Sequence, residues 1–283
     1  MKKHLPTLIV VLIFICGLSL FLYPTVSNLY NEYLNKKRIG DYEESFAAHS
    51  PEKIDQELEN ARAFEENRHD PDTLQELGLT YENILNLSDD GMMGYIEIPK
   101  ISVSLVIYHT IEEEVLQDGL GHVESSSLPI GGKSTHCVLA GHTGLPSAKL
   151  LTNMDQLKIG DPFYIHVLDE VLEYRVDDIA VVEPHEVDRL DVVSGKDHLT
   201  LVTCTPYGIN SHRLLVRGER VSNGGNYSSD QLPLQNDLMN IEMKYLLTFS
   251  LIGLLILAIA IYKLVGIRKN KKKKEKENQD SKS

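Results

Sequence analysis

Cysteine is scarce in this chain: its 283 residues include only Cys16, Cys137 and Cys204. Three thiols cannot form the network of disulfide bonds that stabilises small secreted domains. The chain also lacks any Cys-x-x-Cys or His-x-x-x-His pair at the spacing of zinc ligands. A glycine-rich phosphate-binding loop is missing as well. The sequence therefore predicts neither a metal ion nor a cofactor.

Positive charge is scarce in the middle of the chain and concentrated near its end. Residues 24–244 carry 17 Lys and Arg against 38 Asp and Glu, a net charge of −21, whereas residues 268–283 carry 8 against 3. The acidic middle argues against nucleic acid as a partner, because phosphate binding requires the opposite sign. The length suits one medium-sized domain with appendages.

Two long apolar runs bracket the acidic region, and each is long enough to cross a bilayer as a helix. We predict transmembrane helices over residues 5–24 and 244–267. Basic residues stay cytoplasmic, so residues 1–4 and the basic tail 268–283 are expected inside the cell and the acidic region outside. A cleaved signal peptide is the alternative for the first run, but no obvious small-x-small cleavage site follows it.

In the region expected outside the cell, the residue pattern changes near residue 91 from helical spacing to short strands. Residues 25–90 are predicted to be a helical stalk that starts a new helix at Ser50-Pro51 and breaks at Asp70-Pro71, because proline disfavours a helical residue before it. Helical spacing resumes over residues 74–87. Residues 223–243 are a polar linker.

Residues 91–222 read as about eight short strands with few helices, a pattern typical of a closed or nearly closed β-barrel. Short helices are predicted over residues 112–120 and 149–157. The region has no internal repeat.

Cys204 stands at the end of one predicted strand, and Arg213 begins the next after a turn rich in Pro, Gly, Asn and Ser. Antiparallel neighbours lie only about 5 Å apart, so the guanidinium can accompany the thiol as a fixed positive charge. That pair suits a thiol nucleophile. The alternative is a buried cysteine that acts as a small hydrophobic residue.

A thiol nucleophile also needs a base, and the extracellular region has ten histidines. His142 is the most suggestive, because Gly141-His-Thr-Gly144 follows a strand and exposes the ring on a loop. His136 shares its predicted face. Periodicity alone does not choose among the histidines.

The run Thr200-Leu-Val-Thr-Cys204, followed nine residues later by Arg213, resembles the active-site signature of sortases, the cysteine transpeptidases of Gram-positive bacteria. Ala140–Gly144 resembles the segment with their catalytic histidine, and Gly94–Ile101 their first strand. The resemblance spans residues 91–221. It implies a mainly β fold: a closed, eight-stranded sortase barrel with short helices, preceded by the helical lid region and flanked by the two transmembrane helices.

The resemblance also implies roles for individual residues. Cys204 would be the nucleophile that carries an acyl thioester, His142 the general acid and base, and Arg213 the group that stabilises the oxyanion and the substrate. Thr203 and Leu201 would contact the substrate.

The second apolar run and the long helical region resemble class C sortases, the pilin polymerases. This class implies cleavage of a Leu-Pro-x-Thr-Gly-like sorting signal between Thr and Gly and transfer to a pilin lysine. Pilin subunits and the cell membrane are then the expected partners. One alternative is a housekeeping sortase that attaches surface proteins to the peptidoglycan precursor, although such enzymes usually lack the second span. Another is a non-enzymatic, membrane-anchored extracellular domain.

Class C members typically carry a lid in which an Asp-Pro-aromatic segment plugs the cleft, with the Asp on the active-site arginine and the ring over the cysteine. Asp70 and Pro71 are the only match here, and the next residue is Asp72. The resemblance thus predicts an Asp70–Arg213 contact without the ring. Phe64 is an alternative source of the ring.

Overall fold

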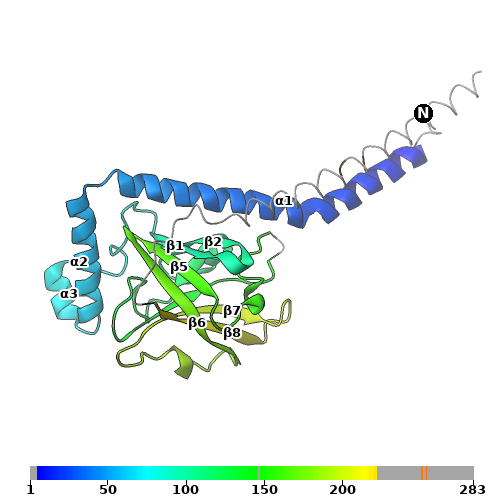
Figure 1. Cartoon of the computed structure of the whole chain (residues 1–283). Helices are drawn as coiled ribbons and strands as arrows, with labels where there is room; N and C mark the ends of the chain where they lie inside the picture. The colour runs from blue at the N-terminus through cyan, green and yellow to red at the C-terminus, as the bar shows by residue number, and fades with distance from the viewer. Residues whose placement is uncertain (1–4, 146, 222–249, 251–252, 254–283) are drawn as a thin grey trace, which may run out of the picture. The chain divides into compact units, whose positions relative to one another are not determined.

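The computed structural model describes residues 5–145, 147–221, 250 and 253. Its centre is a closed barrel of eight strands in the order β1-β2-β3-β4-β7-β8-β6-β5, which confirms the predicted mainly β fold (Figure 1). The strands are β1 Met92–Ile98, β2 Val103–Tyr108, β3 Leu120–His122, β4 Thr135–Ala140, β5 Pro162–Val167, β6 Glu170–Val182, β7 Asp197–Thr205 and β8 His212–Arg220.

Alternation along the strands fills the barrel. In β7 the side chains of Leu199 and Leu201 are fully buried, and on β8 Val216, which lies opposite Leu201, is fully buried as well. Successive strand residues point to opposite faces, so Cys204 lies on the outer face. The apolar inner face therefore fixes the register of β7, and with it the side on which the thiol appears.

Three helices precede the barrel: α1 Leu5–Ala47, α2 Pro51–Asn67 and α3 Pro71–Leu77. Ser50 caps α2 and Pro51 opens it, as predicted. The predicted helix over residues 74–87 is wrong beyond Leu77. Gly78 ends α3 in the left-handed conformation (φ 69°), and Gly is the residue that adopts it most readily.

Residues 26–47 of α1 are fastened to the barrel by polar contacts. The Tyr42 hydroxyl donates to the Met93 carbonyl (3.4 Å) and accepts from the Leu168 amide (3.0 Å). Arg38 forms an ion pair with Asp118 at 2.7 Å. These contacts attach the helical region to β1, to the short helix that ends at Asp118 and to the turn after β5.

Two short helices around the barrel differ from prediction in different ways. Helix α4 spans Glu113–Asp118, within the predicted range 112–120. The helix predicted over residues 149–157 is reduced to the 3-10 turn η2 Met154–Gln156. The prediction rested on the helical spacing of Leu150, Leu151 and Leu157. In the structure these leucines reach the core from turns and irregular segments instead. The other 3-10 turns are η1 Pro99–Ile101 and η3 Asp188–Leu190.

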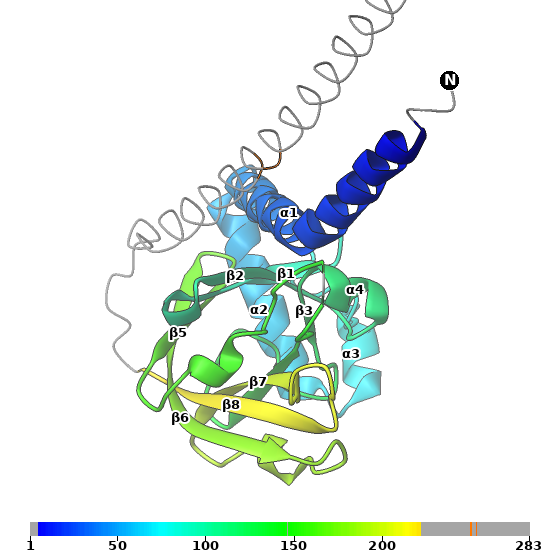
Figure 2. The same cartoon turned by 90° about the vertical axis from the view of Figure 1, so that its right-hand side faces the viewer.

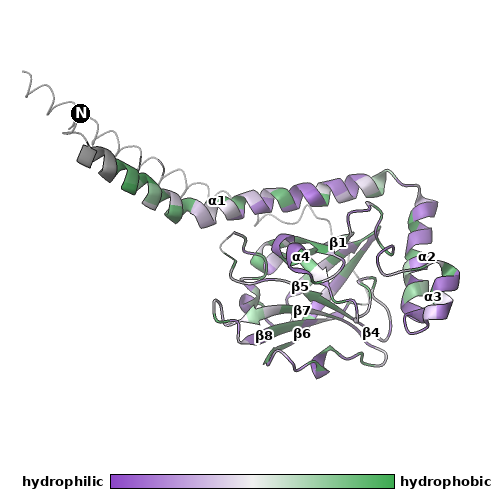
Figure 3. Ribbon diagram, turned by 180° about the vertical axis from the view of Figure 1, so that it is seen from behind, coloured by the Kyte–Doolittle hydropathy of each residue, from purple (hydrophilic) through white to green (hydrophobic). Residues whose placement is uncertain are grey.

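In the described part of the chain one helix, residues Val11–Ala47, is long and apolar enough to cross a membrane. Figure 3 shows apolar residues gathered in the N-terminal part of α1 and polar residues beyond them. This agrees with the apolar run predicted over residues 5–24, although a signal sequence shares the same properties. The predicted linker, second span and basic tail (223–243, 244–267 and 268–283) lie outside the described residues.

Candidate active site

Cys204 and Arg213 lie directly opposite each other on the antiparallel strands β7 and β8, which run side by side in Figure 2. Residues paired in this way share a face of the sheet. Arg213 Nη1 donates to the carbonyls of Asn210 (3.3 Å) and His212 (3.1 Å), which holds the guanidinium over the turn between the strands. The thiol is partly exposed. The fold thus presents a thiol and a fixed cation together.

His142 reaches the same place from the other side of β7. Strands β4 and β7 are parallel, with Ala140 paired to Val202. The two segments stay side by side past the end of β4, because the Thr203 hydroxyl donates to the Gly141 carbonyl at 2.7 Å. Thr203 and Gly141 are 62 positions apart in the sequence, the same separation as Val202 and Ala140. The next residue along each of these two segments is His142 in the loop after β4 and Cys204 in β7, which places the two residues beside each other. The three residues therefore occupy neighbouring positions: Cys204 on β7, Arg213 on β8 and His142 in the loop that follows β4.

Glu113 is a further group at this site. Both of its carboxylate oxygens lie 3.3 Å from His142 Nε2. A hydrogen bond from Gln117 and the nearby charge of His142 lower the pKa of Glu113. Sequence reasoning missed this residue, since nothing in the run Glu112-Glu-Glu114 indicates that α4 packs beside the histidine loop.

Two other histidines of the barrel, His136 and His122, are held in hydrogen-bond networks. Both ring nitrogens of His136 are bonded, Nε2 to the Thr200 hydroxyl at 2.7 Å and Nδ1 to the Asp191 carbonyl at 2.9 Å. His122 is fully buried against the Tyr81 hydroxyl, and burial lowers its pKa to about 4. These contacts distinguish His142, whose partly exposed ring has, among the described residues, the Glu113 carboxylate as its one hydrogen-bond partner.

Thr203 and Leu201 point into the barrel, away from the face that carries Cys204. The Leu201 side chain is fully buried in the core, and Thr203 is 4% exposed with its hydroxyl on the Gly141 carbonyl. The structure gives both residues packing roles in which neither presents a surface to a substrate. Their predicted substrate contact stays a prediction that this burial disfavours.

The turn after Cys204 is apolar and exposed. Tyr207 and Ile209 have 66% and 72% of their surface accessible. The Tyr207 ring lies over Gly144, where an added Cβ would be 3.2 Å from it, and Gly144 has a positive φ of 76°. The turn that follows the thiol therefore contacts the loop that carries His142.

Asp70 does not reach Arg213 in the described part of the chain. Its carboxylate caps α3 instead, accepting from the Thr73 amide (3.3 Å) and hydroxyl (2.7 Å), and these bonds lower its pKa. Pro71 occupies the first helical position, so the Asp-Pro pair starts a helix. The lid prediction instead required this segment to be inserted into the active-site cleft. Phe64, the alternative ring, is buried in the core.

Among the described residues, one cluster has side chains that could bind a metal ion. Atoms of Asp177, His198 and Glu219 lie within 4.8 Å of one another on β6, β7 and β8. Arg217 pairs with Asp177 at 2.7 Å, and Lys196 pairs with Glu219. The two carboxylates are thus already balanced by two cations, which opposes the binding of another cation.

Residues 96–221 match a family model described as the sortase domain. Among solved structures, sortase C1 from Streptococcus agalactiae is 43% identical, with a TM-score of 0.62, and the match covers 66% of this chain and 99% of that one. A sortase C from Clostridium perfringens, solved with the C-terminal cell wall sorting motif, is 40% identical with a TM-score of 0.57 and is covered over 98% of its length, 66% of this chain. Sortase A from Bacillus anthracis is 27% identical over 222 residues, which are 78% of this chain and 96% of that protein.

Proposed function

Because the chain belongs to the sortase family of cysteine transpeptidases, and its most similar structures include class C members at about 40% identity, we propose that it polymerises pilin subunits. It cleaves a Leu-Pro-x-Thr-Gly-like sorting signal between Thr and Gly. It then transfers the threonyl group to a lysine of another pilin subunit. The observation that carries this proposal is the pairing of Cys204 with Arg213 on β7 and β8, next to the loop after β4 that contains His142.

In the first half of the reaction, the Cys204 thiolate attacks the carbonyl carbon of the threonine. A C–S bond forms, and the negative charge on the carbonyl oxygen is stabilised by Arg213, a donor held in place before the reaction starts. Collapse of this intermediate breaks the C–N bond to glycine. His142 gives its proton to the departing amine, which leaves a thioester on Cys204.

In the second half, the lysine amine gives a proton to His142 and its nitrogen attacks the thioester carbonyl. The C–N bond forms, the C–S bond breaks, and Cys204 returns as a thiolate beside a protonated His142. The product is an isopeptide bond, and no oxidant or cofactor is consumed. The Glu113 carboxylate, 3.3 Å from His142 Nε2, holds the ring in position in both halves.

The alternative acceptor is the peptidoglycan precursor used by housekeeping enzymes. Identity favours the pilin reading, because the class C structure from Streptococcus agalactiae is 43% identical and the Bacillus anthracis sortase A is 27% identical. The proposed topology places the barrel outside the cell, held by the apolar part of α1 and by a second span over residues 244–267.

The test uses the full-length chain in detergent. Incubation with a Leu-Pro-x-Thr-Gly peptide is expected to add the mass of the acyl fragment to Cys204, as seen by mass spectrometry. Addition of a pilin-derived lysine peptide should then release a branched product. The Cys204→Ala protein is the control and should form neither species. A wild-type protein that never acquires the adduct contradicts the proposal.

A further inference from the structure

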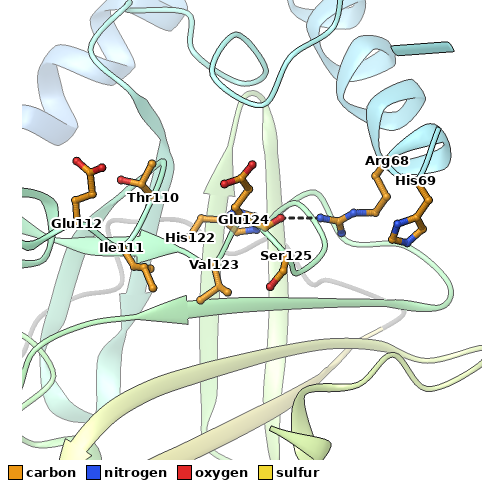
Figure 4. Close-up of a pocket in the computed structure, with 9 residues that line it drawn as sticks. All are labelled: Arg68, His69, Thr110, Ile111, Glu112, His122, Val123, Glu124 and Ser125. Atoms are coloured by element: carbon orange, nitrogen blue, oxygen red, sulfur yellow. Dashed lines mark hydrogen bonds between the residues drawn. The ribbon is translucent and has the colours of Figure 1, made fainter. Parts of the chain in front are cut away.

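An open pocket of about 730 Å³ lies between the α2–α3 junction and the loops that follow β2 and β3. Figure 4 shows Glu112 at one end and Arg68 and His69 at the other, with Glu124 between them. Ile111 and Val123 supply apolar surface. The pocket is therefore an elongated trough with both apolar and acidic walls.

The acidic side chains of the trough are uncompensated. Neither Glu112 nor Glu124 has an ion-pair or hydrogen-bond partner for its carboxylate in the described part of the chain. The cation nearby, Arg68, is already neutralised, because Nη1 pairs with Glu65 at 3.2 Å and Nη2 donates to the Glu124 carbonyl at 2.8 Å. The trough thus presents net negative charge and suits a cationic ligand.

The wall that contains Arg68 is built before any ligand arrives. The side chains of Arg68 and Glu65 are only 14% and 15% exposed, and the second Glu65 oxygen accepts from the Leu128 amide at 2.9 Å. His122 is buried behind this wall and is held in place, because its Nε2 is bonded to the Ser127 carbonyl at 2.8 Å. A preformed pocket of this kind binds without a large ordering cost.

The acidic end of the trough adjoins the reacting groups. Glu112 is the residue before Glu113, and the Glu113 carboxylate lies 3.3 Å from His142 Nε2. Consecutive Cα atoms are about 3.8 Å apart, so the Glu112 end of the trough lies next to the residue that contacts the base of the reaction.

We propose that this trough is the subsite for the side chain of the acceptor lysine. The four methylenes lie on Ile111 and Val123, and Glu124 and Glu112 attract the ammonium group. The ammonium group releases one proton to water, and His142 takes the second as the nitrogen of the neutral amine attacks the thioester carbonyl. The inference rests on the proposed function and names the subsite for its second substrate. The carboxylates recruit the lysine, and they take no part in bond making.

The test separates the two halves of the reaction in the full-length protein. A Leu-Pro-x-Thr-Gly peptide first acylates Cys204, and the products are followed as the concentration of a lysine peptide is raised. Glu112→Gln and Glu124→Gln are each expected to raise the half-saturating lysine concentration about fivefold, by loss of a charge-assisted contact at a partly exposed site. The increase should shrink at high salt.

Two controls keep the result specific. Glu114→Gln alters the next exposed glutamate of α4, which does not line the trough, and should leave the lysine dependence as in the wild type. Hydroxylamine, a small neutral nucleophile, should react equally well with the acylated variants and wild type. Equal half-saturating lysine concentrations in wild type, Glu112→Gln and Glu124→Gln overturn the subsite while leaving the proposed function intact. A wild type that forms no thioester overturns both.

Discussion

The hydrogen bond from Thr203 to the Gly141 carbonyl ties the strand of the nucleophile to the loop of the base, so its removal is the most direct test of the site geometry. The bond is 2.7 Å long and Thr203 is 4% exposed. Thr203→Val keeps the volume and leaves the buried carbonyl without this donor, which costs about 1–3 kcal/mol. Melting temperature should fall by about 2–12 °C, at roughly 2–4 °C per kcal/mol for a domain of this size.

Activity should fall more than stability suggests, because the loop that carries His142 loses its link to β7. We expect the kcat of donor-peptide cleavage to drop about tenfold or more, since a displacement of about 1 Å can cost a hundredfold. Thr203→Ser is the matched control: it keeps the donor, loses one methyl group worth about 1 kcal/mol, and should retain most of the kcat.

Two results would refute this reasoning. Thr203→Val with wild-type melting temperature and kcat would show that the bond does not position the loop. A raised KM for the donor peptide with unchanged melting temperature would instead assign Thr203 a direct contact with substrate, as the family resemblance suggests. Cleavage of a fluorogenic sorting peptide and thermal unfolding of the same preparation measure both quantities.

Three further predictions concern the surroundings of the site. Burial lowers the pKa of His122 from 6.5 to about 4, so the unfolded chain binds more protons than the folded chain in this pH range. The free energy of unfolding should therefore fall by about 3 kcal/mol as the pH drops from 6.5 to 4. His122→Asn should reduce this dependence of stability on pH, as measured by denaturant titrations. Gly144→Ala should cost about 1–2 kcal/mol because of its positive φ, and should lower kcat as the His142 loop shifts, whereas an unchanged kcat would contradict the contact with Tyr207. Asp70→Ala should speed hydrogen exchange of the first α3 amides without raising donor cleavage. The wild type should lose the same protection as the pH falls below about 4, because the pKa of Asp70 is lowered in the fold. Faster donor cleavage by the variant would support the hypothesis that this segment acts as a lid.

The barrel and its central pair were predictable because they depend on local patterns. Alternating residues in β7 and β8 place Leu201 inside and Cys204 outside, and the intervening turn residues set the register that pairs Cys204 with Arg213. The partnership with His142 was not derivable from periodicity, since the β4–β7 pairing joins residues 62 positions apart. The loop Gly141–Gly144 made His142 the most suggestive of the ten histidines and the family resemblance selected it, and the bonds made by His136 now give a physical reason to exclude that residue.

Errors arose where one turn residue decides between two structures. Helical spacing continues past Leu77, but Gly78 adopts a conformation that ends the helix, and the downstream leucines reach the core from turns. The sequence did not indicate a role for Glu113 for a different reason. Its importance comes from the packing of α4 beside the histidine loop, which no short sequence window contains.

The Asp-Pro segment shows how a single position redirects a functional element. An aromatic residue after Pro71 would favour insertion into a cleft, because its ring gains from burial. Asp72 instead carries a negative charge in the first turn of α3, where the helix dipole favours it, and Asp70 satisfies the amide of Thr73. Both carboxylates therefore stabilise a helix that is exposed on the surface. Insertion would require this cap to be broken and Asp72 to be desolvated, so the chemistry of this segment opposes closure over Cys204.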